Sequence, residues 1–368
     1  MRSTHPGAFF YKGRLFFKRS EKMRVWKIEN EIILYSTILN TTPIELENAL
    51  KIENKDYYYG NTIQIPKKNG KRIICCVDKE NILYSLQKKL TQNFLSNIML
   101  SDCVYGFVEG YNYFDFLNEH TDFWGNKYFL RLDIKSFFDS IDQAQVKKVL
   151  TYYIEDNCKV KATILDNIVD ILLYKGALIQ GAPSSPAISN IIFRPIDIRI
   201  QKYCSKCGVD YSRYADDLLF SCHRNIIHHS RFICGIKRIL TSNGFCLNLK
   251  KIVKAQKEIS LGGYVVSTDI RLSRNKIKTI TRLLYILEHF KEDDYTDFIK
   301  NLNDKIQQNK GTQKFNNKFQ LVNHLAGYRS FFISAIKYSK NEKYKLQLHK
   351  KIKRIENQID ILESKKNL

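Results

Sequence analysis

Two adjacent aspartates, Asp216 and Asp217, constrain the fold more than any other feature, because they stand between two apolar runs. The valine, tyrosine, leucine and phenylalanine residues of those runs favour extended chain. Aspartate suits turn geometry, so the pair is predicted to lie at the tip of a β-hairpin. Adjacent carboxylates repel each other, and a divalent cation would remove that repulsion by binding their oxygen atoms. The alternative is a solvated polar turn.

A third carboxylate, Asp133, ends an apolar run that starts at Tyr128 and is predicted to be a largely buried strand. A charged residue at such a position is costly unless it is paired or binds a metal ion. The chain continues through Phe137 and Phe138. Successive strand positions face opposite ways, so at least one of these two rings is predicted to be a core residue.

A loop of small residues, Gln180-Gly-Ala-Pro-Ser-Ser-Pro-Ala-Ile-Ser-Asn190, runs into an apolar segment predicted to be a helix from Ala187. Small side chains allow backbone amides to approach a phosphate group or a base closely. The segment is therefore a candidate nucleotide-binding loop. The alternative is a simple helix-entry loop.

A hairpin is predicted upstream, where alternating residues at 62–65 and 72–75 flank Asn69-Gly70, a dipeptide typical of hairpin turns. Basic residues crowd its predicted tip, namely Lys67, Lys68, Lys71 and Arg72. They indicate either an edge hairpin protected by charge or a basic finger that binds phosphates.

The charge balance predicts a polyanionic partner, because 60 Lys+Arg against 37 Asp+Glu give a formal net charge of +23. Nucleic acid is favoured over membrane, since no segment offers about 18 consecutive apolar residues. The N-terminus has no apolar signal core, and the nine cysteines are scattered, so reduced thiols and a cytoplasmic location are expected. Cys204-x-x-Cys207, with the Cys and His residues at 222–229, fits no clean zinc module.

Both ends of the chain show helical signals. Thr42-Pro43 followed by Glu45 is typical of a helix start with a capping box. A heptad-like apolar seam runs along the C-terminal segment at Leu348, Ile352, Ile355, Ile359 and Leu362. The seam predicts either docking onto the body of the protein or self-association.

These features, taken in order, resemble the fingers and palm of reverse transcriptases, most closely bacterial enzymes of the retron and defence-associated (Abi-like and unknown-group) type. The resemblance covers residues 56–335. The motifs that carry it are Ile65-Pro-Lys-Lys-Asn-Gly-Lys-Arg72, Leu132-Asp-Ile-Lys-Ser-Phe-Phe-Asp-Ser-Ile141, Gln180 to Asn190, Tyr214-Ala-Asp-Asp-Leu218, Leu247-Asn-Leu-Lys-Lys251 and Leu261-Gly-Gly-Tyr264. Two departures, at 116–120 in place of Asn-Ala-x-x-His and at 260–262 in place of Val-Thr-Gly, favour a defence-associated enzyme outside the retrons.

The resemblance implies an α+β fold of the right-hand polymerase type, with fingers, a palm built on an antiparallel sheet with packed helices, and a helical thumb. The implied domains are an N-terminal extension at 1–55, fingers at 56–127, a palm at 128–266 with finger-contributing helices at 143–180, a thumb at 267–340 and a C-terminal helix at 341–368.

By the same resemblance, Asp133, Asp216 and Asp217 are the catalytic carboxylates. They would bind two Mg²⁺ ions, or Mn²⁺ in their place, with the backbone carbonyl of Ile134 as a further ligand. The implied nucleotide-binding residues are Lys71, Arg72, Phe138, Gln180, Gly181 and Lys250, and the implied primer grip is Leu261, Gly262 and Gly263. Lys251 is adjacent to Lys250, so the choice between these two lysines stays open.

The implied activity is RNA-directed DNA polymerisation in bacterial antiviral defence. The implied partners are an RNA template in the form of a dedicated non-coding RNA, dNTPs, the DNA product, and an effector protein or second polymerase subunit. Phe138 is expected to pack under the incoming sugar and to exclude a 2′-hydroxyl by steric clash. Alternatives are a template-independent or protein- or RNA-primed terminal DNA polymerase, and a catalytically silent RNA-binding scaffold.

Overall fold

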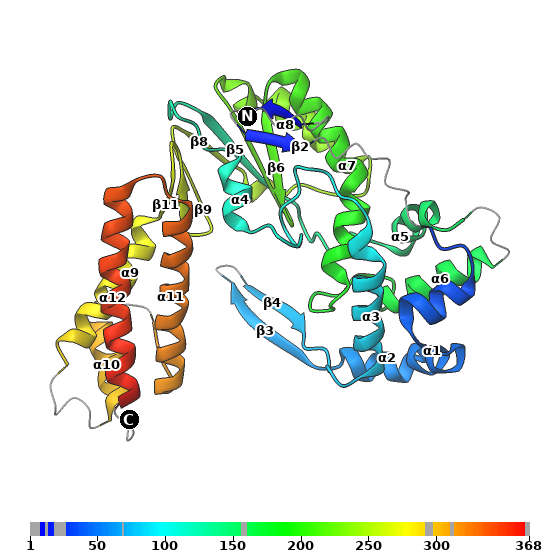
Figure 1. Cartoon of the computed structure of the whole chain (residues 1–368), viewed down its shortest axis with the longest axis horizontal. Helices are drawn as coiled ribbons and strands as arrows, with labels where there is room; N and C mark the ends of the chain where they lie inside the picture. Colours follow the sequence, from blue (N-terminus) through cyan, green and yellow to red (C-terminus); the bar gives the residue numbers. More distant parts are fainter. Residues whose placement is uncertain are drawn as a thin grey trace, which may run out of the picture. The chain divides into compact units, whose positions relative to one another are not determined.

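A computed structural model of the chain describes residues 8–11, 14–17, 27–67, 70–155, 160–290, 297–309 and 313–364 (Figure 1). The chain divides into two compact units, one formed by 1–100 with 136–194 and the other by 101–135 with 195–368. Both combine helices with separate antiparallel sheets, so the fold is α+β, as predicted. No helix within the described ranges is long and apolar enough to cross a bilayer.

The first unit is mainly helical. Its elements are β1 (Ala8–Tyr11), β2 (Arg14–Phe17), η1 (Ile33–Leu39), α1 (Pro43–Leu50), α2 (Ile52–Tyr59), β3 (Thr62–Lys67), β4 (Gly70–Cys75), α3 (Ile82–Asn93), η2 (Leu95–Asn97), α5 (Gln143–Leu150), η3 (Thr151–Tyr153), α6 (Lys161–Leu172) and the start of α7 (Ser185–Cys207). The predicted capping box is confirmed, because the Thr42 side chain accepts from the Glu45 amide while the Glu45 carboxylate accepts from the Thr42 amide.

The predicted finger hairpin is also present. β3 and β4 pair antiparallel, from Thr62 opposite Cys75 to Lys67 opposite Gly70. Gly70 is thus already a strand residue, whereas the sequence placed it in the turn. Lys68 and Asn69 lie outside the described residues, as do the side chains of 66, 67 and 70–72.

The second unit is built on a four-stranded antiparallel sheet. Its elements are α4 (Tyr113–Asn118), β5 (Tyr128–Asp133), the end of α7, β6 (Asp210–Tyr214), β7 (Asp217–Cys222), η4 (Asn225–His228), α8 (Ser230–Thr241), η5 (Leu249–Lys251), β8 (Val253–Gln256), β9 (Ile259–Leu261), β10 (Tyr264–Val266), β11 (Ile270–Leu272), α9 (Arg274–Glu288), α10 (Phe298–Gln308), α11 (Lys318–Tyr338) and α12 (Glu342–Ser364). The strand order is β6-β7-β5-β8.

The two faces of this sheet have different neighbours, because successive strand residues point to opposite sides. On one face the Phe220 ring packs against Phe232 of α8, with ring centroids 5.6 Å apart. On the other face Tyr214 packs against Phe116 of α4, with centroids 5.8 Å apart. Each face of the sheet therefore packs against a helix, α8 on one side and α4 on the other.

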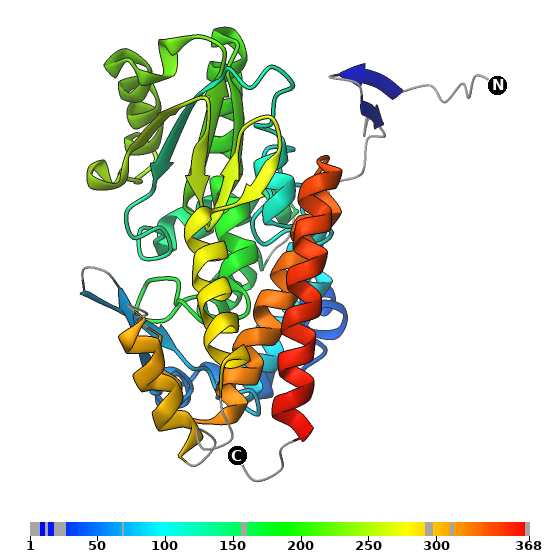
Figure 2. The same ribbon diagram turned by 90° about the vertical axis from the view of Figure 1, so that its left-hand side faces the viewer.

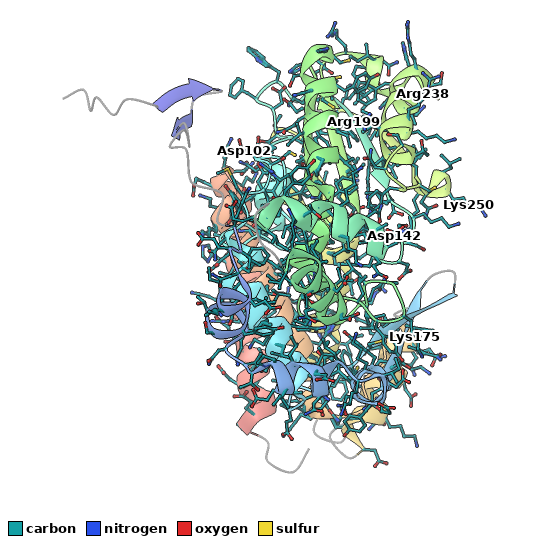
Figure 3. All side chains as sticks on the ribbon, turned by 90° about the vertical axis from the view of Figure 1, so that its right-hand side faces the viewer. Asp102, Asp142, Lys175, Arg199, Arg238 and Lys250 are labelled. Carbon is teal, nitrogen blue, oxygen red and sulfur yellow. The ribbon has the colours of Figure 1, made fainter. Side chains whose placement is uncertain are left out.

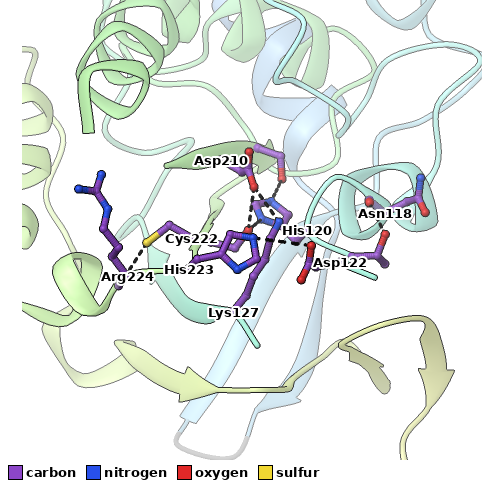
Figure 4. A network of polar contacts seen from close by, with 11 residues as sticks. Asn118, His120, Asp122, Lys127, Asp210, Cys222, His223 and Arg224 are labelled. Atoms are coloured by element: carbon purple, nitrogen blue, oxygen red, sulfur yellow. Dashed lines mark hydrogen bonds and ion pairs between the residues drawn. The ribbon is translucent and has the colours of Figure 1, made fainter. Parts of the chain in front are cut away.

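A buried histidine just after α4 connects this part of the chain to the sheet (Figure 4). His120 is fully buried, and its ring nitrogens lie 2.7 Å from Ser212 Oγ of β6 and 2.8 Å from Ser221 Oγ of β7. Beside it, Lys127 Nζ lies 2.8 Å from Asp210 Oδ2. His120 belongs to one of the two motif departures, and in this chain its contacts are those of a structural core residue.

The C-terminal part of the second unit is a three-stranded sheet, β9-β10-β11, followed by helices. α11 and α12 lie side by side (orange and red in Figures 1 and 2) and are joined by an ion pair between Arg329 and Glu356. The seam residues Leu348, Ile352, Ile355 and Leu362 are buried in the same core as α9 and α11. Docking is therefore the correct alternative for this helix, and oligomerisation through its seam is not supported, because the chain itself covers the apolar side chains.

Candidate active site

The three predicted carboxylates meet in the second unit at the ends of β5 and β7. Asp133 and Asp217 are direct cross-strand partners in the β5–β7 ladder, so their side chains project from the same face. The backbone amide of Ile134 donates to the carbonyl oxygen of Asp216 at 3.0 Å. The predicted grouping of Asp133, Ile134, Asp216 and Asp217 is thus present in the fold.

The tip of the Asp-Asp hairpin is a two-residue turn. Tyr214 pairs with Asp217, which leaves Ala215 and Asp216 as the connecting residues. Ala215 has φ +54°, a left-handed conformation that costs a non-glycine residue about 1 kcal/mol or more. A Cβ at Gly106 would lie 2.5 Å from the Ala215 nitrogen, so the 101–135 segment packs directly on this turn.

Two cations compensate the clustered negative charge. Arg131 donates to Asp217 Oδ1 from Nε at 2.8 Å and from Nη2 at 2.7 Å. Lys251 Nζ lies 2.8 Å from Asp133 Oδ2, and Asp133 itself is buried. Burial raises the pKa of Asp217, and Arg131 opposes that rise, while the charges of Asp216 and Asp133 add to it.

This electrostatic pattern fits a site for divalent cations. The three clustered carboxylates repel one another, and a divalent cation would relieve that repulsion. Their oxygen atoms are the hard ligands that Mg²⁺ prefers. In the described part of the chain, no group of three or more His, Cys, Asp or Glu side chains is already arranged around a common metal position. Asp133 and Asp217 are instead paired with Lys251 and Arg131, each through one carboxylate oxygen.

The two adjacent lysines of η5 differ in their contacts. Lys251 reaches Asp133, as described above. Lys250 projects away from the ribbon in Figure 3. The contact favours Lys251 of the two as the lysine that acts at the carboxylates, and the predicted nucleotide-binding role of Lys250 stays a prediction.

The predicted primer-grip turn lies near the carboxylates. Gly262 and Gly263 connect β9 and β10 with φ +57° and +92°, values that suit glycine. A Cβ at Gly262 would lie 3.0 Å from the hydroxyl of Tyr113, whose ring centroid is 5.0 Å from that of Tyr214. Burial raises the pKa of Tyr113, and the Asp217 charge raises it further. Tyr113 thus connects the glycine turn to the Asp-Asp hairpin.

The remaining predicted residues belong to the first unit, where two of them dock on β4. The Cys75 amide donates to the Gln180 carbonyl oxygen at 3.0 Å. Gly181 has φ +113°, and a Cβ there would lie 2.1 Å from the Cys75 carbonyl oxygen. Glycine is therefore required by close backbone approach. This contact fixes the 180–190 loop to the strand that carries Lys71 and Arg72, whose side chains are outside the described residues.

The two phenylalanines after Asp133 have different environments. Phe137 is buried against Phe193 of α7, with ring centroids 5.6 Å apart, whereas Phe138 is half-buried. The prediction of a core phenylalanine is confirmed for Phe137. The reason given for it was wrong, because residues 135–140 form turns rather than a strand.

Two residues that contact the site, Arg131 and Tyr113, were not predicted from the sequence. Arg131 is the one charged residue inside the apolar run before Asp133, and strand alternation places it on the same face as Asp133. Tyr113 carries no comparable signal.

The cysteine motif Cys204-x-x-Cys207 does not gain support as a zinc site. Burial raises the pKa of the Cys204 thiol, which makes Cys204 a poor thiolate ligand, and its buried position is that of a structural cysteine.

Comparison with known proteins identifies the family of this chain. The family model for "Reverse transcriptase (RNA-dependent DNA polymerase)" matches residues 65–266. The retron Ec86 reverse transcriptase of Escherichia coli is 30% identical over 249 residues, which cover 65% of this chain and 73% of that protein. The retron Mx65 reverse transcriptase of Myxococcus xanthus is 27% identical over 239 residues, covering 61% and 55%. The chain is therefore a retron-type bacterial reverse transcriptase. The expectation of an enzyme outside the retrons is not supported by these relatives.

A solved structure of telomerase from Candida albicans with a fragment of telomeric RNA is also similar. It shares 14% identity with this chain at a TM-score of 0.45, and the match covers 84% of this chain and 66% of that one.

Proposed function

The chain belongs to the reverse transcriptase family of RNA-directed DNA polymerases, and on that premise we propose that it copies a dedicated non-coding RNA into DNA at Asp133, Asp216 and Asp217. One observation carries the proposal: Asp133 and Asp217 are cross-strand partners, and the Ile134 amide binds the Asp216 carbonyl beside them. Strands and a turn far apart in the sequence thus bring three carboxylates to one place.

Members of this family generally use divalent metal ions, and the carboxylates fit them. Two Mg²⁺ ions, when bound, would activate the primer 3′-hydroxyl and stabilise the attacking and leaving oxygens. We assign the principal ligands to Asp133 and Asp216, with the Ile134 carbonyl as a further ligand and Asp217, which is paired with Arg131, as the adjacent carboxylate of the site. Lys251 would donate to the leaving phosphate once it is released from Asp133.

The first unit supplies the proposed nucleotide contacts. Lys71 and Arg72 would bind the triphosphate, since a fixed pair of cations suits clustered phosphate oxygens. Gln180 and Gly181 would position the template and the incoming nucleotide. The assignment is supported by the backbone contact of this loop with β4, the strand to which Lys71 and Arg72 belong.

Sugar selection is assigned to Phe138, the half-buried ring, rather than to Phe137. Phe138→Ala is expected to raise the use of rNTPs relative to dNTPs about 10-fold or more, because a clash with the 2′-hydroxyl is removed. Single-nucleotide incorporation with matched rNTP and dNTP measures the ratio. Phe319→Ala, which truncates an exposed ring on α11, is the control. An unchanged ratio in Phe138→Ala, or wild-type protein that uses both sugars equally, contradicts the assignment.

A structured RNA partner is supported by the net charge of +23 and by two exposed aromatic residues. Phe123 and Trp124 are 86% and 79% exposed, with ring centroids 5.4 Å apart, on the segment between α4 and β5. Solvent-facing rings on a basic protein suit stacking with unpaired bases, while lysine and arginine bind the phosphates.

Phe123→Ala/Trp124→Ala is expected to weaken binding of the co-purifying RNA about 10-fold, since stacking contributes about 1–3 kcal/mol per base. Filter binding across a salt series measures this, and log K should fall linearly with log [salt] in both proteins with similar slopes. Phe319→Ala again serves as the control. Unchanged affinity in the double variant would show that these rings do not contact the RNA.

We further infer a role in bacterial antiviral defence, with an effector protein or a second polymerase subunit as partner, and this rests on the likeness to retron-type enzymes. A cytoplasmic location is proposed with it, supported by the free thiols of the eight described cysteines. Phage plating on cells that carry the whole locus, wild type or Asp216→Asn, tests the defence role. Equal plating on both strains across a broad panel would remove its support.

A further inference from the structure

The second unit contains a fully buried ion pair beneath the Asp-Asp hairpin. Arg213 of β6 and Asp197 of α7 are both 0% exposed. Arg213 donates to both Asp197 oxygens, from Nε at 2.9 and 3.1 Å and from Nη2 at 2.7 Å. The Tyr211 hydroxyl donates to Asp197 Oδ1 at 2.8 Å. Such a pair is costly to bury, and its geometry satisfies several donors and acceptors at once.

The same guanidinium also binds the turn that carries Asp216. Arg213 Nη1 donates to the carbonyl oxygen of Ala215 at 3.1 Å. Ala215 is the residue with φ +54°, and its carbonyl carbon is bonded to the Asp216 nitrogen. A left-handed non-glycine residue persists only where its surroundings hold it there. The Arg213 guanidinium holds Ala215 in this conformation through the hydrogen bond from Nη1, and Asp197 fixes the position of the guanidinium.

The Arg213 side chain lies on the face of the sheet opposite to the carboxylates. Arg213 pairs with Leu218 in the β6–β7 ladder, so its side chain lies on the face away from Asp217. Its backbone is fixed as well, because its amide donates to Cys103 O at 2.7 Å and its carbonyl accepts from Tyr105 N at 2.9 Å. The ion pair can therefore hold the turn without touching metal, nucleotide or primer.

We propose that Arg213 and Asp197 are positioning residues that hold the Ala215-Asp216 turn, and with it the Asp216 carboxylate, in the geometry that binds a divalent ion. The inference rests on the proposed metal role of Asp216. Stability alone does not explain the pair, because well-packed apolar residues often replace a buried ion pair without loss of stability.

The test removes both charges together. Arg213→Met/Asp197→Leu leaves no orphaned charge and is expected to shift the midpoint of thermal unfolding by no more than about 5 °C. Titration with Mn²⁺, followed by the electron paramagnetic resonance of the free ion, should show binding weakened about 10- to 100-fold, the usual effect of losing a residue that orients a metal ligand. The apparent KM for Mg²⁺ in primer extension should rise with it, while RNA affinity stays unchanged.

A second ion pair at the same sheet, buried on the lysine side and partly exposed on the aspartate side, provides the control. Lys127 and Asp210 join the far end of β6 and do not contact the turn. Lys127→Met/Asp210→Leu should bind Mn²⁺ as the wild type does. Asp216→Asn in the same titration separates the two hypotheses: if it binds Mn²⁺ like the wild type, the metal role of Asp216 fails, and the positioning role with it.

If Asp216→Asn does weaken binding, a folded Arg213→Met/Asp197→Leu protein with wild-type Mn²⁺ affinity overturns the positioning role alone. Should that double variant fail to fold, Arg213→Lys decides the question. Lysine keeps the charge opposite Asp197, yet its single ammonium lacks the fork that reaches both Asp197 and Ala215. Weakened Mn²⁺ binding in folded Arg213→Lys supports the positioning role, and unchanged binding overturns it.

Discussion

Replacing Asp216 with asparagine is expected to lower dNTP incorporation on a primed RNA template about 1000-fold or more, equivalent to about 4 kcal/mol of transition-state stabilisation. The amide keeps the shape of the side chain and removes its negative charge, so the divalent ions lose a ligand at the point where charge develops. RNA affinity should stay near the wild-type value, because the substitution removes no cation that binds phosphates.

The control for this variant is Asp102→Asn, which makes the same charge change at an exposed position of the same unit (Figure 3). It should extend primers at the wild-type rate. Full activity of Asp216→Asn, measured as single-nucleotide incorporation under the same conditions, would remove Asp216 from the catalytic site.

Gly181→Ala is expected to lower incorporation about 100-fold, mainly through a higher KM for dNTPs. The new methyl group would lie 2.1 Å from the Cys75 carbonyl oxygen, and the residue already has φ +113°. Relief of that clash requires the loop to leave β4, which breaks the hydrogen bond from the Cys75 amide to Gln180. Strain and overpacking of this kind each cost about 1–3 kcal/mol.

Gly176→Ala is the matched control, because Gly176 has φ +81° in the same unit and a Cβ there would meet nothing within 4 Å. It carries the backbone strain without the clash, so its KM for dNTPs should stay near the wild-type value. A Gly181→Ala protein with wild-type KM would show that contact between loop and strand does not position the nucleotide.

Local signals predicted the parts of the site that depend on neighbouring residues. Adjacent aspartates between β-forming runs predicted the hairpin, and Thr42-Pro43 predicted a helix start that the capping hydrogen bonds confirm. The cross-strand register of Asp133 and Asp217 depends on tertiary pairing. The resemblance to reverse transcriptases suggested that pairing, whereas hydrophobic periodicity did not.

Features that depend on packing between distant elements could not be predicted. Arg213 and Asp197 lie on a strand and a helix, and a charged residue in an apolar run gives no sign of whether it is paired inside the core. The lysines of η5 are adjacent, and only the fold decides which of them reaches Asp133. Strand alternation predicted that Phe137 or Phe138 is a core residue, yet residues 135–140 form turns, and these direct the Phe137 ring into the core.

The most direct test of the account is primer extension by the purified chain on a primed RNA template of defined sequence, with the product sequenced. We expect DNA complementary to the template, made only when a divalent ion is present and lost in Asp133→Asn. This result would also exclude a silent scaffold and a template-independent polymerase. A product whose sequence ignores the template, or equal product from wild type and Asp133→Asn, would contradict the account.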